Sequence, residues 1–150
     1  KSVVMVMAKL LELAKLAATE GEVPVAAAVV DAATGQVLAT AVNRTERDCD
    51  PTAHAEVLAI REACRLLQTT RLPQCDLYVT LEPCAQCAAA LSFARIRKLV
   101  FGAYDPKGGA VEHGPRFYSQ PTCHHAPEVV GGVRESECAA VLKNFFGERR

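Results

Sequence analysis

Apolar positions along the 150-residue chain switch between two spacings, and the switches predict where helices and strands alternate. Near the start, apolar side chains recur every three or four positions, which is typical of an amphipathic helix that ends close to Gly21. Two short apolar runs follow at 24–31 and 36–42. The turn residues Thr34 and Gly35 between them predict a hairpin.

The middle of the chain predicts a helix, a strand and a second helix. After a polar loop, Thr52 is expected to cap a helix that runs to about Leu67. The apolar run at 76–81 predicts a buried strand. Pro83 suits the first turn of a helix, and the Ala-rich segment that follows extends that helix to Phe93.

The last third predicts two strands and a closing helix. A strand is expected at 98–103, followed by a Gly- and Pro-rich segment at 105–127. Residues 128–133 are a candidate for a short last strand, and 134–146 predict the helix. Strands separated by helices favour parallel pairing, so this order predicts an α/β fold: a three-layer α/β/α sandwich around a mixed sheet of about five strands. The length suits a single domain over 1–150.

Charge gives no clear sign of a nucleic-acid partner. The 17 basic and 17 acidic residues balance, which argues against a strongly basic surface. Residues 91–120, however, carry five basic side chains against two acidic ones. These residues could face a phosphate backbone, or they could be ordinary solvated surface charge, and the sequence alone leaves both interpretations open.

The number of cysteines and the length of the apolar runs indicate the cellular compartment in which the protein is expected. Seven cysteines are an odd number for a disulfide framework, so a reduced cytoplasmic protein is expected. No apolar run reaches 18 residues, so no membrane span is expected. Lys9, Glu12 and Lys15 interrupt the apolar opening segment at helical spacing, which argues against a secretory signal.

Two short motifs carry the candidate chemistry: His54-Ala55-Glu56, and the segment 83–87 (PCAQC). Cys84 and Cys87, three positions apart on a helical turn, point the same way and can bind one ion. Alone, such a pair also fits a redox site or two buried thiols, and a lone histidine more often packs or caps. Together with His54 the pair is more specific, because zinc binds imidazole nitrogen and thiolate sulfur, and three protein ligands leave a fourth position for water.

Glu56 is the candidate proton carrier. It lies two residues after His54, so on a regular helix its side chain diverges from the metal and suits a place beside a zinc-bound water. The competing interpretation is a helix glutamate that faces solvent. A redox pair at Cys84 and Cys87 would leave His54 and Glu56 without a function, whereas a deaminase would use all four residues.

These residues resemble the signature of the cytidine deaminase superfamily, which is His-x-Glu followed downstream by Pro-Cys-x-x-Cys. Similarity to bacterial TadA-type tRNA adenosine deaminases extends over nearly the whole chain. The segments that carry it are GEVPVAAAVV, NRTERDCDPTAHAEVLAIREA, LYVTLEPCAQCAAALSFARIRKLVFGAYDPKGGA and ECAAVLKNFFGERR. Ala26 departs from the family, in which glycine is common, and its methyl group is expected near the floor of the pocket. Gln86 departs too, standing where methionine is usual.

The resemblance implies one zinc ion per chain, held by His54, Cys84 and Cys87, with Glu56 as the proton shuttle. It also implies a cytidine deaminase-like fold. The family generally acts as a homodimer that binds a tRNA anticodon stem-loop across both subunits, so the same assembly and partner are expected here.

The resemblance also implies a set of substrate contacts. Asn43 would contact a flipped adenine, and the backbone at Ala55 would help to orient it. Asp105 and Lys107 match positions near the substrate's backbone. Phe145 and the two terminal arginines lie where the family's last helix meets RNA.

The leading functional hypothesis is hydrolytic conversion of adenosine to inosine at the wobble position of a tRNA anticodon. The alternative keeps the chemistry but replaces the substrate with a free nucleobase or nucleoside, such as cytosine, guanine or an analogue. A third hypothesis is a non-catalytic RNA-binding subunit with structural zinc. Such a protein would be expected to lack the shuttle carboxylate, which Glu56 supplies here.

Overall fold

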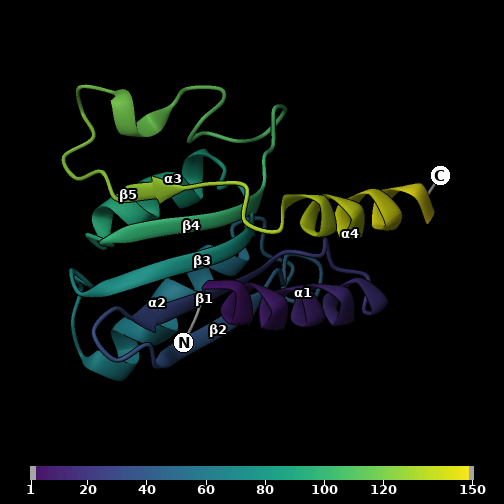
Figure 1. Cartoon of the computed structure of the whole chain (residues 1–150), viewed down its shortest axis with the longest axis horizontal. Coiled ribbons are helices and arrows are strands. Elements are labelled where there is room, and N and C mark those ends of the chain that lie inside the picture. The colour runs from purple at the N-terminus through teal and green to yellow at the C-terminus, as the bar shows by residue number, and fades with distance from the viewer. Residues whose placement is uncertain (1–2, 149–150) are drawn as a thin grey trace.

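A five-stranded mixed sheet forms the centre of the computed structural model, which describes residues 3–148 (Figure 1). The strand order across the sheet is β2-β1-β3-β4-β5. In chain order the elements are α1 (Val3–Thr19), β1 (Ala26–Asp31), β2 (Val37–Val42), α2 (Ala55–Leu67), β3 (Cys75–Leu81), α3 (Ala85–Phe93), β4 (Lys98–Ala103), the short 3-10 helix η1 (Phe117–Ser119), β5 (Glu128–Val130) and α4 (Glu135–Glu148).

The strand directions confirm the mixed sheet but differ from the expected pairing at one place. Strand β1 pairs antiparallel with both β2 and β3, whereas β3, β4 and β5 are parallel. The expectation of parallel pairing across a helix holds for β3 with β4 but not for β2 with β3, which run parallel without pairing. The reason is that α2 carries the chain from β2 across β1 to β3. Strands β2 and β3 consequently run in the same direction, with β1 between them.

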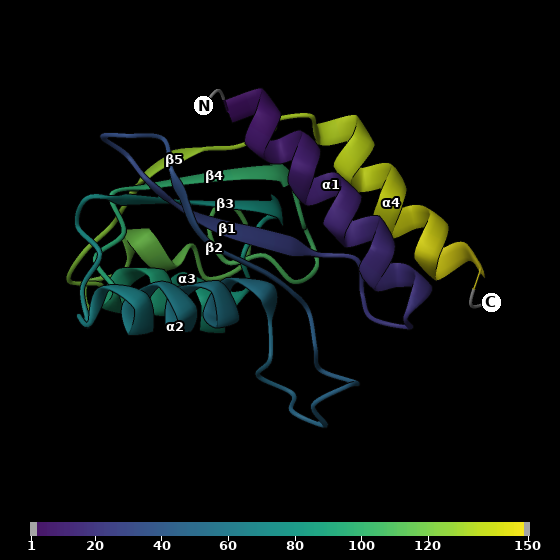
Figure 2. The same ribbon diagram turned by 90° about the horizontal axis from the view of Figure 1, so that it is seen from below.

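Helices cover both faces of the sheet, which confirms the three-layer sandwich. Helices α2 and α3 lie on one face, and α1 and α4 lie on the other (Figure 2). The buried residues of β1 alternate between the two faces, as a strand requires: Ala27 and Val29 pack with α2 and α3, whereas Ala26 and Val30 pack with α1. No described helix combines the length and the apolar character that a membrane crossing requires.

Two helix starts differ from those expected, and both differences concern the candidate site. Helix α2 begins at Ala55 with His54 in the N-cap position, and the Thr52 hydroxyl instead donates to Asp50 Oδ1 at 2.7 Å. The expected cap at Thr52 is therefore wrong. Helix α3 begins at Ala85 with Cys84 in the N-cap position, so Pro83 precedes the helix. Both N-cap residues have extended backbone and make no side-chain capping bond, which leaves their side chains available for other contacts.

Candidate active site

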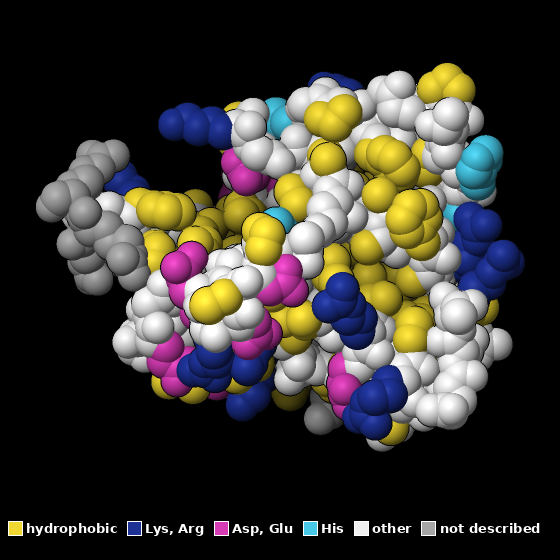
Figure 3. Space-filling model, turned by 180° about the vertical axis from the view of Figure 1, so that it is seen from behind, with side chains coloured by type: hydrophobic (Ala, Val, Ile, Leu, Met, Phe, Trp, Pro, Cys, Tyr) yellow, Lys and Arg dark blue, Asp and Glu magenta, His cyan; other side chains and the backbone are white. Residues whose placement is uncertain are grey.

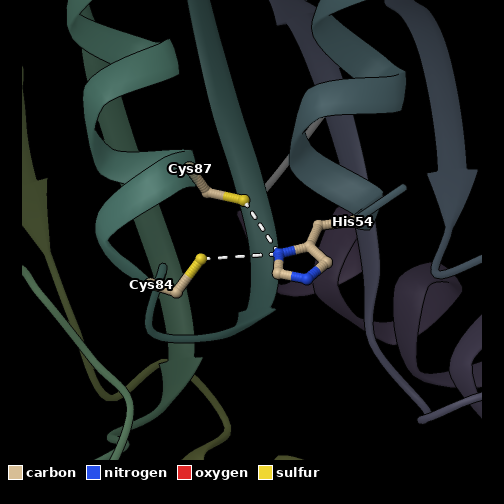
Figure 4. Close-up of side chains that lie close together, drawn as sticks. All are labelled: His54, Cys84 and Cys87. Carbon is tan, nitrogen blue, oxygen red and sulfur yellow. Dashed lines mark hydrogen bonds between the residues drawn. The ribbon is translucent and has the colours of Figure 1, made fainter. Parts of the chain in front are cut away.

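Three side chains that can bind a metal converge where the N-termini of α2 and α3 meet. Within the described part of the chain, His54, Cys84 and Cys87 form the one such group, with ligand atoms all within 4.8 Å of one another. His54 Nδ1 lies 3.4 Å from Cys84 Sγ and 3.5 Å from Cys87 Sγ (Figure 4). The three residues named by the two sequence motifs are thus brought together.

The spacing and chemistry of this group fit zinc. Tetrahedral zinc with nitrogen at about 2.0 Å and sulfur at about 2.3 Å holds the two kinds of ligand about 3.5 Å apart, which matches both nitrogen–sulfur distances. One imidazole and two thiols form a donor set that zinc favours. Three protein ligands also leave one of the four tetrahedral positions open to a water or substrate.

The electrostatics of the thiols also favour a cation. A hydrogen bond from Cys87, together with one from His54, lowers the pKa of Cys84 to about 4 despite its burial. The pKa of Cys87 is raised because its thiol donates to Cys84 and is itself buried. One negative charge is therefore shared by the two sulfurs, and a bound divalent cation would allow both to ionise. The N-termini of α2 and α3 add positive potential, which favours thiolate.

Glu56 is buried beside this group, so the interpretation of it as a solvent-facing glutamate is wrong. Its side chain lines the same cavity as His54 and Cys84 and is only 5% exposed. Burial raises the pKa of Glu56 to about 7. A carboxyl group with this pKa can both take up and release a proton at neutral pH, which is what a proton shuttle requires.

The cavity in front of the metal-binding group has a volume of about 180 Å³. The lining residues come from one edge of the sheet. Those from the sheet lie at or just after the ends of β2, β3 and β4, or just before the start of the antiparallel β1. The lining residues are Val23, Val25, Asn43, His54, Glu56, Leu81, Glu82, Cys84, Asp105 and Gly108. The cavity is smaller than the 300–1,000 Å³ typical of sites for drug-sized ligands, so it suits a group about as large as one base.

Asn43 has a fixed orientation in this cavity. Its side-chain Oδ1 accepts a hydrogen bond from the Ala55 N–H at 2.9 Å, which leaves the amide NH2 as the group available to a ligand. Ala55 itself is fully buried and is absent from the cavity lining. Its N–H therefore influences a bound ligand by orienting Asn43 and not by direct contact.

The other expected substrate residues are divided between two regions. Asp105 lines the cavity, whereas Lys107 is exposed on the same loop and donates its N–H to Asp105 Oδ1 at 3.3 Å. Phe145 lies elsewhere, in a hollow between α1 and α4 that Lys15 and Val141 also line. The two terminal arginines lie outside the described residues.

Sequence reasoning missed Glu82 and misplaced Ala26. Glu82 lines the cavity and is almost fully buried, and four hydrogen bonds lower its pKa despite that burial. A glutamate at the end of a buried strand, directly before Pro83, is a signal that could have identified it, because such a carboxylate needs donors. Ala26 packs against the α1 side of the sheet, so its methyl group is not on the floor of this cavity.

Comparisons with known proteins agree with the geometry. Residues 2–103 match the family model of the cytidine and deoxycytidylate deaminase zinc-binding region. The tRNA-specific adenosine deaminase of Agrobacterium fabrum is 58% identical over 137 residues, which cover 91% of this chain and 89% of the relative. A solved structure from work on A-to-I editing by tRNA:A34 deaminases is 57% identical with a TM-score of 0.88, covering 91% of this chain and 97% of that one.

A guanine deaminase structure from Bacillus subtilis is more distant. It is 33% identical with a TM-score of 0.66, covering 69% of this chain and 66% of that one. The metal-binding group, the buried glutamate and these similarities support one assignment. The chain belongs to the zinc-binding cytidine and deoxycytidylate deaminase family, and within it to the tRNA-specific adenosine deaminases.

Proposed function

We propose that this protein converts adenosine to inosine by hydrolysis at the wobble position of a tRNA anticodon. The observation that carries the proposal is the joint placement of the three-ligand group and buried Glu56 in one base-sized cavity. The names of two relatives that are more than half identical to this chain support the choice of substrate. Water is added at C6 of adenine and ammonia leaves, so the reaction needs one nucleophile and a carrier of protons.

His54 Nδ1 and the sulfurs of Cys84 and Cys87 are proposed to hold one zinc ion. When bound, zinc supplies a water activated for attack at neutral pH. The chain's own part is to keep three ligands at fixed spacing at two helix starts. Burial of Cys87, with an exposed fraction of 0%, closes the site on the side away from the cavity.

Glu56 is proposed to move the protons. Its carboxylate takes a proton from the attacking water and delivers it to the ring nitrogen of the base. It then takes the second proton, from the hydroxyl group now on C6, and gives it to the departing amine. A pKa of about 7 suits both directions of transfer. The same carboxylate distinguishes this protein from a non-catalytic RNA-binding subunit with structural zinc, for which a buried, cavity-facing acid would serve no purpose.

Asn43, Asp105 and Lys107 are proposed to bind the substrate. The free NH2 of Asn43 would donate to an acceptor nitrogen of the flipped base, with Ala55 fixing the amide. A cavity that admits about one base requires the adenosine to leave its stack. Asp105 and Lys107, on the loop after β4, would then meet the ribose-phosphate backbone. Phe145 and the end of α4 would contact RNA further from the cavity.

The alternative substrate, a free nucleobase or nucleoside such as cytosine or guanine, has less support. The guanine deaminase relative is much less similar than the tRNA-acting ones. The exposed Lys107, on the loop after β4, also suits a substrate with a phosphate backbone.

We also infer a single deaminase domain over 1–150, acting as a homodimer in the cytoplasm. One sheet with helices on both faces supports the single domain.

The face formed by α2 and α3 supports the dimer, because Leu66, Leu67 and Phe93 are exposed there and hydrophobic side chains gather on it (Figure 3). Within residues 3–148 all seven cysteines are free, which suits a reducing compartment, as does a tRNA substrate.

The substrate is tested with an anticodon stem-loop that carries adenosine at the wobble position. Inosine formation is expected from this RNA and not from free adenosine, cytosine or guanine assayed in parallel. The same stem-loop with the adenosine one position away from the wobble site is the matched control. Turnover of a free base alone would overturn the tRNA assignment while leaving the zinc site intact.

Replacement of the proton shuttle is expected to abolish turnover without loss of metal. Glu56→Gln removes the carboxyl group that takes up and releases the proton but keeps the shape of the side chain, so the rate should fall by about 10²–10⁴-fold. Zinc content and stem-loop binding should match those of the unaltered protein. Glu62→Gln, at an exposed glutamate on the same helix, should keep full activity. Retained activity in Glu56→Gln would disprove the role of Glu56.

Removal of one ligand is expected to release the metal. His54→Ala and Cys87→Ser should each bring the zinc content well below one ion per chain. Loss of even an outer partner typically lowers metal affinity by about 10–100-fold, and loss of a ligand lowers it further. Elemental analysis of the purified variants measures this. Cys64→Ser, a half-buried cysteine on α2 outside the group, should keep its zinc, and full zinc in His54→Ala would refute the ligand set.

A further inference from the structure

Glu82 is a second buried carboxylate in the cavity, and the proposed reaction does not use it. It follows directly after β3 and precedes Cys84 by two residues, so it adjoins the segment that carries a zinc ligand. Its side chain is wholly inaccessible to solvent. A buried carboxylate without partners would be strongly destabilising, so its contacts indicate its role.

One loop supplies all four of the hydrogen bonds that Glu82 accepts. Glu82 Oε1 accepts from the N–H of Asp105 at 3.0 Å and lies 2.8 Å from His113 Nδ1. Glu82 Oε2 accepts from the N–H of Val111 at 3.2 Å and from that of Glu112 at 2.9 Å. The carboxylate thus binds both ends of the 105–113 segment and closes it into a loop over the cavity.

The loop approaches this carboxylate so closely that glycine is required. A Cβ atom on Gly109 would lie 2.5 Å from both Cδ and Oε2 of Glu82, and 2.6 Å from the Asp105 carbonyl oxygen. Next to Gly109, the N–H of Ala110 donates to the Pro83 carbonyl at 2.9 Å. The loop is therefore held against 82–83 by side-chain and backbone contacts together.

Glu82 has no accepting capacity left for a substrate. A carboxylate offers about four lone-pair sites on two oxygens, and four donors already occupy them. Glu56, in contrast, accepts no hydrogen bond from such a loop and stays available for proton transfer. The difference separates the two acids: Glu56 can take part in chemistry, whereas Glu82 can act only through what it holds.

What Glu82 holds is one wall of the substrate cavity. Asp105 and Gly108 of the loop line the cavity. The Asp105 side chain is oriented in turn, because its Oδ1 accepts from the N–H groups of Lys107 and Gly108. A displacement of the loop would therefore move the Asp105 carboxylate relative to Cys84.

We propose that Glu82 is a positioning residue that fixes the 105–113 loop relative to the zinc ligand Cys84 and so sets the affinity for the substrate. The substrate part of this inference rests on the proposed deaminase function. The loop part rests only on the contacts of Glu82. The two parts can be measured separately.

Two variants test the inference from opposite sides of the contact. In Glu82→Gln an NH2 group replaces one oxygen, so at least one backbone N–H loses its acceptor whichever way the amide is turned: that of Asp105 at the Oε1 position, or those of Val111 and Glu112 at the Oε2 position. Gly109→Ala places a methyl group against the same carboxylate and leaves β3 and α3 unaltered. Asp76→Asn is the matched control, because Asp76 is a buried carboxylate near the opposite end of β3, paired with Arg97 at 2.8 Å.

Amide hydrogen exchange, zinc content and steady-state kinetics with the anticodon stem-loop are measured for all three variants. In Glu82→Gln and Gly109→Ala the N–H groups of Asp105, Val111 and Glu112 should exchange about tenfold faster or more. Zinc should stay at one ion per chain. KM should rise about tenfold with little change in kcat, because the wall binds the substrate without taking part in proton transfer. Asp76→Asn should show none of these changes, although the loss of its ion pair with Arg97 should lower the melting temperature of the protein.

Several results would overturn the inference. Unchanged exchange in the loop would show that Glu82 does not hold it. Faster exchange with unchanged KM would show that the loop does not set substrate affinity. Loss of zinc in parallel with activity would show that Glu82 acts on the metal. An unaltered protein that does not deaminate the stem-loop would overturn the proposed function instead. Amide hydrogen exchange would still show whether Glu82 holds the loop. KM would then be measured with the free base that the protein converts.

Discussion

The convergence of the α2 and α3 N-termini is the constraint on which the rest of the structure depends. Strands β2 and β3 run in the same direction, so the helices that follow them begin at the same edge of the sheet. His54 and Cys84 occupy the two N-cap positions, and Cys87 follows one turn later. The strand order thus brings together ligands that are 30 residues apart in sequence, and the same edge supplies every wall of the cavity.

Two buried glutamates at this edge differ because their surroundings differ. Burial raises the pKa of Glu56 to about 7, which makes it able to exchange protons. Three backbone N–H groups and His113 hold the pKa of Glu82 below its usual range. The same residue type therefore suits proton transfer in one place and binds a loop in the other, a division that environment alone can produce. The orientation of Asn43 is likewise set by its surroundings, because the hydrogen bond that it accepts from the Ala55 N–H decides which end of the amide faces the cavity.

The sequence predicted every strand and long helix, the three layers, and the metal-binding residues, because each has a local signal. The hydrophobic period gives the elements, and the His-x-Glu and Pro-Cys-x-x-Cys motifs give the site. The features that it did not predict depend on contacts between distant parts of the chain. The antiparallel pairing of β1 with β3, the start of α2 after His54 and not Thr52, and the loop held by Glu82 all belong to this kind. The expectation that Ala26 lies near the floor of the pocket was wrong, because an unbroken apolar run does not show to which face of the sheet each residue of a short buried strand turns.

The central claim is that the chain binds zinc through three of its own side chains and leaves the fourth position open for the reaction. X-ray absorption spectroscopy at the zinc edge of the metal-loaded protein tests it most directly. The account predicts two sulfur ligands at about 2.3 Å and two nitrogen or oxygen ligands at about 2.0 Å, one of them exchangeable for an added anion. Three or four sulfur ligands, or a closed site with no exchangeable ligand, would identify a structural zinc and contradict the account.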